Sequence, residues 1–307
     1  MTTAVRGNIH SQEGLTKHTP APIADTRDSW GLTKLPAAGR PTPTAGYVRV
    51  IAHAPLADRY MALTLHAPRI AATAQPGQFL MLTAARRGEK IPALPRPMAV
   101  YATDPVTGMV EVLYGVVGDG TRRLETFAAG EQMFVVGPLG RRFELPDGTR
   151  RVLLIGRGIG TCSLTTVAQD NAGRGIETIA VTSAREPEAI IGADFYRAQG
   201  ATQIYEVTDR DGTSSPAALF DVLTRDWDTT PPELIFTCGS DRLTRLCERL
   251  ADRWGSKVQV SVEAHMACGL GYCHGCASGA RSEGDESPLI CHDGPVFSWE
   301  PPLTRAS

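Results

Sequence analysis

The sequence predicts a multidomain fold of class β plus α/β. We expect an antiparallel β-barrel, then a parallel α/β domain, then a small cysteine-rich domain. Three observations predict this order. Short strand-like runs fill 47–146, strands and helices alternate from Arg150 onward, and the last 50 residues combine four cysteines with many loop-forming residues. A chain of 307 residues has room for about two or three domains.

The composition favours a folded protein and excludes some partners. Hydrophobic residues make up 42% of the chain, charged residues 21%, and the formal net charge is −2. No broad basic surface for nucleic acid is therefore expected. No apolar run reaches the length of about 18 residues that a membrane span needs, and the N-terminus lacks the apolar region of a secretory signal. We expect a soluble cytoplasmic protein, whose thiols stay reduced and more often bind metal than form disulfides.

Residues 1–44 differ from the rest of the chain. Thr, Pro, Ala and Gly are frequent there, and the apolar residues follow no period. This composition predicts a disordered tail. Such a tail is either a dispensable extension or a docking arm for a partner.

The region 45–148 is expected to form the barrel. Turn pairs such as Pro76-Gly77 and Thr107-Gly108 separate short runs of strand-forming residues. Several short strands at this spacing are typical of a small antiparallel barrel. The runs are Tyr47–Ile51, Met61–Leu65, Phe79–Leu82, Met109–Val117 and Met133–Val136.

The region 149–258 alternates strands and helices, which predicts a parallel sheet covered by helices. An amphipathic helix is expected over Asp241–Trp254, with Ser240 as its N-cap and Gly255 as its end. Two more helices are expected near 163–171 and 187–199. The expected strands are Val152–Ile155, Glu177–Val181, Gln203–Val207 and Leu234–Thr237.

The C-terminal region 259–307 contains four cysteines with the spacing C-x4-C-x2-C-x14-C: Cys268, Cys273, Cys276 and Cys291. The first three follow the spacing of plant-type 2Fe–2S proteins. A cluster needs backbone N–H groups close to its sulfurs, and glycine allows both the approach and the sharp turns. Gly269, Gly271 and Gly275 meet that need. The spacing therefore favours a 2Fe–2S cluster bound by all four thiolates.

Zinc is the competing interpretation. Cys273 and Cys276 form a typical zinc half-site, and three histidines nearby could serve as ligands: His265, His274 and His292. However, four-cysteine zinc sites usually pair two C-x2-C motifs, and the sequence has no second one. The cluster is favoured, and the histidines are then solvated loop residues, contacts to a partner, or groups that couple the cluster to pH.

Three stretches before the cysteines have features of phosphate or flavin binding. Arg96-Pro97 ends a predicted strand with a cation and a fixed backbone angle, and Gly118-Asp119-Gly120-Thr121 offers small residues with open N–H groups. Gly156-Arg157-Gly158-Ile159-Gly160 follows a strand and opens a helix, where a phosphate could meet the helix N-terminus. Each signal alone also fits an ordinary turn, a surface ion pair or close packing.

In this order, the motifs resemble those of one family. The resemblance covers about 46–300 and is carried by Pro76-Gly77-Gln78-Phe79, Arg96-Pro97, Gly118–Thr121, Gly137–Gly140, Gly156–Gly160, Thr208–Gly212, Thr237–Gly239 and the cysteine loop with Asp293–Phe297 after it. The chain resembles the electron-transfer subunits of type B dihydroorotate dehydrogenase. These belong to the ferredoxin reductase-like flavoproteins.

The resemblance implies FAD in the barrel, NAD(P)H on the α/β domain and a 2Fe–2S cluster that faces a catalytic oxidoreductase subunit. An FMN-bearing dihydroorotate dehydrogenase is the family's example of such a partner. Electrons would pass between NAD(P)H, FAD, cluster and partner in a hetero-oligomer, and no catalytic residue is assigned. The residues implied for FAD are Arg96, Pro97, Met98, Ala99, Val116, Gly118, Gly120 and Thr121. Those implied for NAD(P)H are Gly156, Gly158, Gly160, Asp209, Cys238 and Gly239.

The chain also departs from the family pattern. Ala99 stands where the family usually has Ser or Thr, Arg157 replaces a glycine, and Ser240 replaces a proline. Most departures surround the expected nicotinamide site, so Arg157 could contact a phosphate or block the usual pose. Two alternatives stay open: a stand-alone NAD(P)H:acceptor reductase and a zinc-stabilised binding protein without enzymatic activity.

Overall fold

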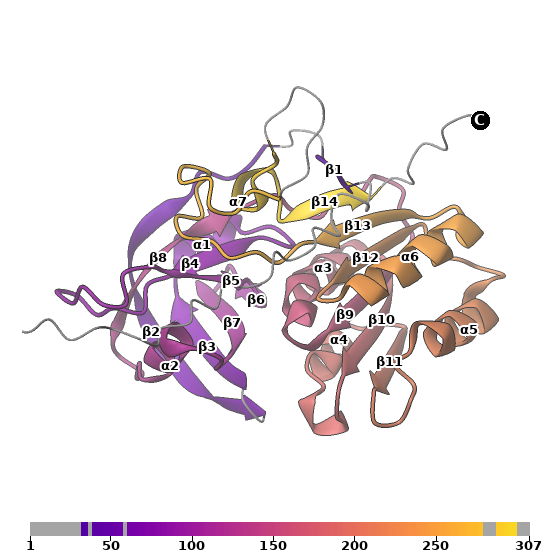
Figure 1. The fold of residues 1–307 in the computed structure, drawn as a ribbon, viewed down its shortest axis with the longest axis horizontal. Coiled ribbons are helices and arrows are strands. Elements are labelled where there is room, and N and C mark those ends of the chain that lie inside the picture. Colours follow the sequence, from indigo (N-terminus) through magenta and orange to yellow (C-terminus); the bar gives the residue numbers. More distant parts are fainter. Residues whose placement is uncertain (1–31, 36–38, 58–59, 279–286, 300–307) are drawn as a thin grey trace, which may run out of the picture.

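The computed structural model describes residues 32–35, 39–57, 60–278 and 287–299. They form two halves that lie side by side, each built on a seven-stranded sheet (Figure 1). One sheet is curled and antiparallel, and the other is mostly parallel and covered by helices. The cysteine loop lies along the top of the first half in that view, next to the boundary between the two halves.

The first half is an antiparallel sheet with the strand order β5-β4-β8-β2-β3-β7-β6. Its end strands β5 and β6 do not pair with each other in the described part of the chain, so the expected barrel is an open half-barrel. The strands are β2 (Thr44–Ala57), β3 (Tyr60–His66), β4 (Phe79–Leu82), β5 (Arg96–Ala99), β6 (Ala102–Asp104), β7 (Met109–Gly115) and β8 (Gln132–Leu139); the helices are α1 (Pro68–Thr73) and α2 (Asp119–Glu125).

The second half has the strand order β1-β14-β13-β12-β9-β10-β11. Strands β9 to β13 pair in parallel, whereas β14 and β1 are antiparallel additions at one edge. The elements are β1 (Leu32–Thr33), β9 (Arg151–Arg157), α3 (Cys162–Arg174), β10 (Glu177–Ala184), α4 (Ala193–Ala198), β11 (Gln203–Thr208), α5 (Pro216–Trp227), β12 (Leu234–Cys238), α6 (Asp241–Trp254), β13 (Lys257–Ser261), α7 (Ile290–Asp293) and β14 (Val296–Trp299).

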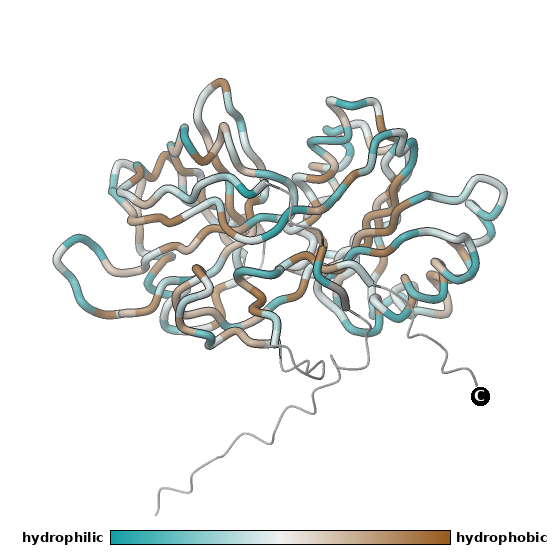
Figure 2. The backbone as a smooth tube through the Cα atoms, turned by 90° about the horizontal axis from the view of Figure 1, so that it is seen from above, coloured by the Kyte–Doolittle hydropathy of each residue, from teal (hydrophilic) through white to brown (hydrophobic). Residues whose placement is uncertain are grey.

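Strand β9 shows why this sheet is buried on both faces. Leu153 and Ile155 point into the core shared with α5 and α6, while Val152 and Leu154 point into the core shared with α3. Because side chains alternate along a strand, a continuous apolar run fits a sheet covered on both faces. Hydrophobic segments run through the inside of both halves, and hydrophilic ones lie mostly in the outer loops (Figure 2).

The predicted helices were recovered with one exception. Helix α6 has the expected bounds, and Gly255 ends it in the left-handed conformation at φ 69°. The expected helix over 187–199 is wrong as one element. It divides into a 3-10 turn over Pro187–Ala189 and the short α4, because Gly192 between them takes φ 87° and packs against Thr161.

Two predicted domain limits fall inside continuous structure. The limit between 44 and 45 lies within β2, and the limit between 258 and 259 lies within β13. Strand β14 from the C-terminal region extends the α/β sheet. Within the predicted tail 1–44, β1 pairs with β14 and Leu35 is buried, while 1–31 and 36–38 lie outside the described residues. Among the described residues, no helix has the length and apolar character needed to cross a membrane.

Candidate flavin and iron–sulfur site

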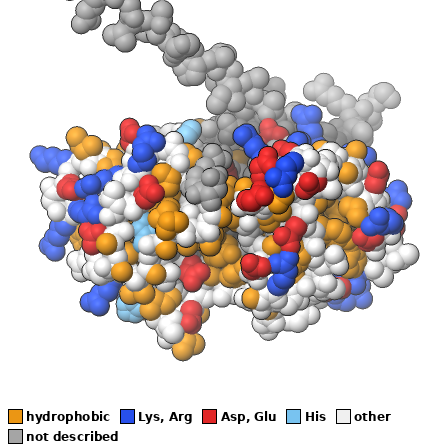
Figure 3. Space-filling view, turned by 90° about the horizontal axis from the view of Figure 1, so that it is seen from below, with side chains coloured by type: hydrophobic (Ala, Val, Ile, Leu, Met, Phe, Trp, Pro, Cys, Tyr) orange, Lys and Arg blue, Asp and Glu red, His pale blue; other side chains and the backbone are white. Residues whose placement is uncertain are grey.

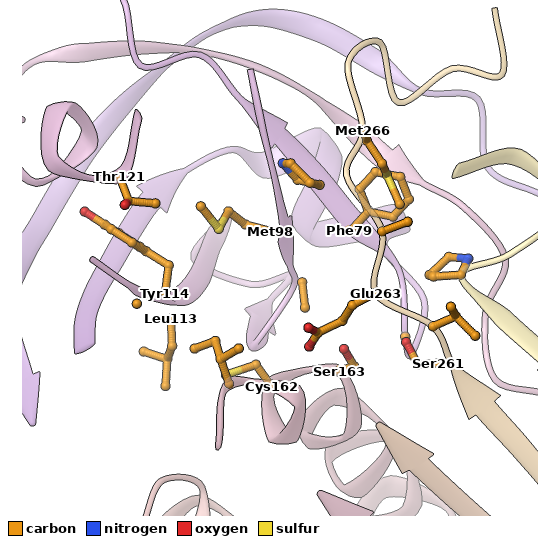
Figure 4. A pocket seen from close by; sticks show the side chains of 18 of the residues that line it. Phe79, Met98, Leu113, Tyr114, Thr121, Cys162, Ser163, Ser261, Glu263 and Met266 are labelled. Carbon is orange, nitrogen blue, oxygen red and sulfur yellow. The ribbon is translucent and has the colours of Figure 1, made fainter. Parts of the chain in front are cut away.

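A pocket of about 320 Å³ lies between the two halves. Hydrophobic side chains lie along the boundary of the halves on the face drawn in Figure 3. The first half contributes Phe79, Pro97, Met98, Ala99, Leu113, Tyr114 and Thr121; the second contributes Cys162 and Ser163; the segment after β13 contributes Glu263 and Met266 (Figure 4). The walls are thus mostly apolar, with a few polar groups, as expected for a pocket that holds an aromatic ring system.

Four of the eight residues expected to bind FAD line this pocket: Pro97, Met98, Ala99 and Thr121. The whole run Arg96–Ala99 is strand β5, and three of its members line the pocket. The guanidinium of Arg96 lies directly over Gly120, where an added Cβ would be 2.0 Å from Nε. Only glycine leaves this space, so Arg96 and Gly120 form one cradle of a cation and open backbone.

Thr121 and Val116 have partly structural roles. The Thr121 hydroxyl accepts hydrogen bonds from the N–H groups of Val117 at 2.9 Å and Gly118 at 3.0 Å, which closes the turn before α2. Its side chain still lines the pocket. Val116 packs, partly buried, against the core of the half-barrel. Thr121 therefore both closes an ordinary turn and lines the pocket, whereas Val116 is not among the lining residues.

The glycines expected to bind NAD(P)H bring two chain segments together. An added Cβ on Gly160 would lie 2.7 Å from Cα of Gly239 and 2.8 Å from the carbonyl oxygen of Cys238. Gly239 itself has φ 100°. An added Cβ on Gly156 would lie 2.6 Å from the hydroxyl oxygen of Thr161. These contacts join the carboxyl ends of β9 and β12, the edge at which α/β sheets place ligands.

Asp209 is held by two arginines. Arg157 donates to its carboxylate at 2.7 Å, Arg242 donates at 2.9 Å, and Ser214 also donates to it. The bonds from Arg157 and Ser214 hold the pKa of the Asp209 carboxyl well below its usual range. Arg157 donates further to the hydroxyl of Ser183 at 2.8 Å. Its guanidinium therefore lies across the ends of β9, β10 and β11.

Two polar residues of the pocket were not among the predicted site residues. Glu263 follows the end of β13, and Figure 4 shows its carboxyl group extending toward the same part of the pocket as Ser163. The pocket walls partly desolvate the carboxyl group and so raise the pKa of Glu263, although the residue is exposed to solvent on one side. Ser163 also lies 3.6 Å from the Cys238 thiol. The sequence signal for Glu263 is its place just beyond a parallel strand.

The four cysteines form two pairs. Cys268 and Cys273 are hydrogen-bonding partners, and so are Cys276 and Cys291. The described residues hold no group of three His, Cys, Asp or Glu side chains at the spacing of a single metal ion. Two pairs of thiols are what a two-iron cluster requires, since each iron takes two cysteine ligands.

Backbone N–H groups point at these sulfurs. Gly271 donates to Cys291 Sγ at 3.1 Å, Leu270 donates to Cys268 Sγ at 3.3 Å, and the N–H of Cys291 donates to Cys276 Sγ at 3.4 Å. Burial opposes ionisation of Cys268, yet the bonds from N–H groups outweigh it and lower the pKa of this thiol to about 7. Such donors stabilise thiolates and cluster sulfides alike.

Glycine lets the loop reach this geometry. Gly269 and Gly271 have φ 71° and 79°, and an added Cβ on Gly269 would lie 2.5 Å from Cγ of Met81 in β4. The cysteine loop is therefore seated directly on the half-barrel. The donor set, the paired thiols and the N–H groups fit a 2Fe–2S cluster, and the Arg96–Gly120 cradle fits the phosphate of a flavin nucleotide.

The three histidines take different positions. His265 is exposed, His274 is a loop residue at φ 56°, and His292 contacts Arg40 and Asp293. His292 directly follows Cys291. His274 likewise directly follows Cys273, so two of the three histidines are chain neighbours of the four cysteines.

Comparison with known proteins agrees with this geometry. Residues 263–301 match the model of the iron-sulfur cluster binding domain of dihydroorotate dehydrogenase B. The chain is 31% identical over 254 residues to the dihydroorotate dehydrogenase B (NAD(+)) electron transfer subunit of Geobacillus thermodenitrificans, covering 81% of this chain and 94% of that one. The corresponding subunit of Bacillus caldolyticus is 30% identical over 246 residues, 79% and 92% of the two chains.

Solved structures share the fold. One is the NADH-dependent reduced ferredoxin-NADP oxidoreductase described for flavin-based electron bifurcation, with a TM-score of 0.67, 24% identity, and coverage of 82% of this chain and 87% of that one. Another is the ferredoxin reductase in carbazole 1,9a-dioxygenase, with a TM-score of 0.56, 20% identity, and coverage of 72% and 68%. Together, the fold, the thiol geometry and the matches to full-length relatives place the chain in the family of dihydroorotate dehydrogenase B electron transfer subunits.

Proposed function

We propose that the chain binds FAD and a 2Fe–2S cluster and relays electrons between NAD(P)H and a catalytic oxidoreductase subunit. We call the site formed by Cys268, Cys273, Cys276 and Cys291 the cysteine cage. One observation carries this proposal: a single chain segment contributes to both the flavin pocket and the cysteine cage. Glu263 and Met266 line the pocket, and Cys268 begins the cage. Two residues span at most about 7 Å. Electrons that leave the pocket on this side therefore have a short path to the cage.

The residues would act by binding and positioning. Arg96 and Gly120 would hold the flavin pyrophosphate, Met98 and Ala99 would flank its ring, and the four cysteines would bind the irons. When bound, these cofactors exchange two electrons with a nicotinamide as hydride and pass electrons on one at a time. Ala99 offers the ring no hydroxyl, so we assign the polar contacts in this part of the pocket to Ser163 and Glu263.

The cysteine loop offers a surface for the catalytic subunit. Leu270 is 52% exposed and Tyr272 is 91% exposed, and Cys273 is exposed as well, whereas Cys276 and Cys291 are buried. Exposed aromatic and aliphatic side chains are frequent anchors of protein interfaces. The relatives are electron transfer subunits of dihydroorotate dehydrogenase B. We therefore propose an FMN-bearing dehydrogenase of that type as the partner, in a hetero-oligomeric complex.

For the nicotinamide nucleotide, we propose the edge where Gly160 meets Gly239. The relatives' name contains NAD(+), which favours NADH over NADPH. Asp209 would hold the Arg157 side chain over the ends of β10 and β11, on the side of this edge that lies away from β12. We also propose a cytoplasmic location, because all seven cysteines are free thiols, as in a reducing compartment.

The test begins with purification of the native complex from cells. Expected results are a brown protein with about two irons and one FAD per chain, bleaching of the flavin by NADH without oxygen, and a dehydrogenase subunit that copurifies. A protein with about one zinc and neither iron nor flavin would contradict the whole proposal. Activity of the isolated chain without any copurifying subunit would instead support a stand-alone reductase.

A further inference from the structure

An N-terminal segment outside the family resemblance reaches the cysteine cage. Residues 32–35 and 39–43 precede the half-barrel, yet β1 pairs with β14 on the opposite half through Leu32↔Trp299 and Thr33↔Ser298. Leu35 is 8% exposed and belongs to the apolar core around Phe143. We call these residues the strap. A buried anchor and strand pairing give the strap a fixed position on the molecule.

The strap contacts the short helix that carries the fourth cysteine. Nη1 of Arg40 donates to the backbone carbonyl of His292 at 2.7 Å, and Nη2 lies 3.2 Å from Nε2 of the same residue. Lys34 lies 3.7 Å from the Asp293 carboxylate. Both contacts fall within two residues of Cys291. The strap therefore contacts the two residues that directly follow Cys291.

The strap also encloses one side of the cage. A cavity of about 320 Å³ lies beneath it, lined by Arg40, Pro41 and Pro43 on one side and by Gly269, Leu270 and Cys291 on the other. The charges that face Arg40 are those of Arg141, Asp293 and the Cys291 thiol. Arg40 and Lys34 add two cations near the cage, while Asp293 supplies one anion.

We propose that the strap holds Cys291 in place and that the guanidinium of Arg40 raises the reduction potential of the cluster. Reduction adds one electron to an anionic group, and a fixed cation nearby favours the added charge. The hydrogen bond that Arg40 donates to the backbone carbonyl of His292 keeps the guanidinium next to Cys291. This inference rests on the iron–sulfur part of the proposed function.

The experiment uses the full-length protein with both cofactors. Arg40→Gln removes the charge and Arg40→Lys keeps it without the forked contact, while Arg225→Gln on α5, whose partner is Asp226, serves as a matched arginine control. Two quantities are measured: the cluster midpoint potential by EPR during a redox titration, and the rate of iron release to a chelator, followed by absorbance. Circular dichroism and FAD content show that each variant is folded.

Arg40→Gln is expected to make cluster reduction less favourable by about threefold or more in equilibrium constant. Arg40→Lys should keep the potential near the wild-type value, yet release iron about threefold faster, because the two-pronged contact is lost. Arg225→Gln should change neither quantity. An unchanged potential and an unchanged release rate in Arg40→Gln would overturn this inference but leave the proposed function standing. A wild-type protein without iron would overturn the proposed function and this inference together.

Discussion

The cysteine loop (268–276) and the nucleotide loop (156–160) are both rich in glycine, but their glycines serve different ends. In the cysteine loop, they let N–H groups reach the thiols. In the nucleotide loop, Gly160 packs against the backbone of Gly239, and the long side chain of Arg157 is held by a carboxylate. The first loop is shaped around side-chain ligands and the second around contacts within the protein.

This difference explains why one site is visible in the sequence and the other is not. Metal chemistry requires one residue type at fixed spacing, so four cysteines predict their own ligand. Nucleotide phosphates are bound largely by backbone N–H groups, and any small residue supplies these. A glycine needed for packing looks the same in sequence as a glycine needed for a phosphate.

The largest effect is expected from Cys273→Ser, which tests the cysteine loop directly. Cys273 is exposed, so serine should leave the fold intact while removing one ligand. We expect nearly complete loss of the cluster, measured as iron content and as absorbance between about 400 and 550 nm. The control is Cys247→Ala in the core of α6, which should keep the iron. Full iron content in Cys273→Ser would contradict the assignment of Cys273 as a cluster ligand, and with it the contrast between the two loops.

Gly120→Ala should have the next largest effect and tests the flavin side. The new Cβ meets the end of the flexible Arg96 side chain, which can move aside. Stability should change by less than about 1 kcal/mol, whereas FAD affinity should fall about tenfold or more with displacement of the cation. Fluorescence titration with FAD measures this. Gly173→Ala, whose Cβ meets open space, is the control. Equal FAD affinity in both variants would assign Gly120 to packing alone.

Asp209→Asn tests whether the ion pair with Arg157 stabilises the nucleotide loop. The variant should be less stable at pH 7 by about 0.5–1 kcal/mol, since solvent screens a pair whose Asp209 is 39% exposed. The lowered pKa of Asp209 means that its stabilisation is present above the ordinary carboxyl range and is lost as the pH falls toward the folded pKa. Urea unfolding should therefore show the difference narrowing below about pH 4. Asp221→Asn on α5 is the control, and a difference that does not depend on pH would rule out the ion pair as its cause.

The smallest effect concerns Glu263. Its raised pKa means that the folded protein holds this proton more tightly than the unfolded chain. Stability therefore falls as the pH rises from the ordinary carboxyl range through the folded pKa. Glu263→Gln should remove this component, worth less than about 0.5 kcal/mol because the pocket is open to water. Thermal unfolding from pH 4 to pH 8 measures it, with Glu125→Gln as control. Parallel curves for wild type and Glu263→Gln would contradict the expectation.

Much of the fold could be predicted from local patterns. The bounds of α6 follow from its apolar face and from Gly255, and β9 follows from a continuous apolar run. The division of 187–199 could not be predicted, because Gly192 packs against a residue about thirty positions earlier in the chain. Long-range contacts of this kind leave no local signal.

The sequence by itself determined which four cysteines we propose as cluster ligands and the order of the two sheets, since both depend on residue type and on short-range periodicity. The tertiary structure alone decided the rest of the site. It places Glu263 and Ser163 in the flavin pocket, brings Arg157 into contact with Asp209, and brings Arg40 into contact with His292. These groups are far apart in sequence, and only tertiary packing sets the distances on which their electrostatics depend.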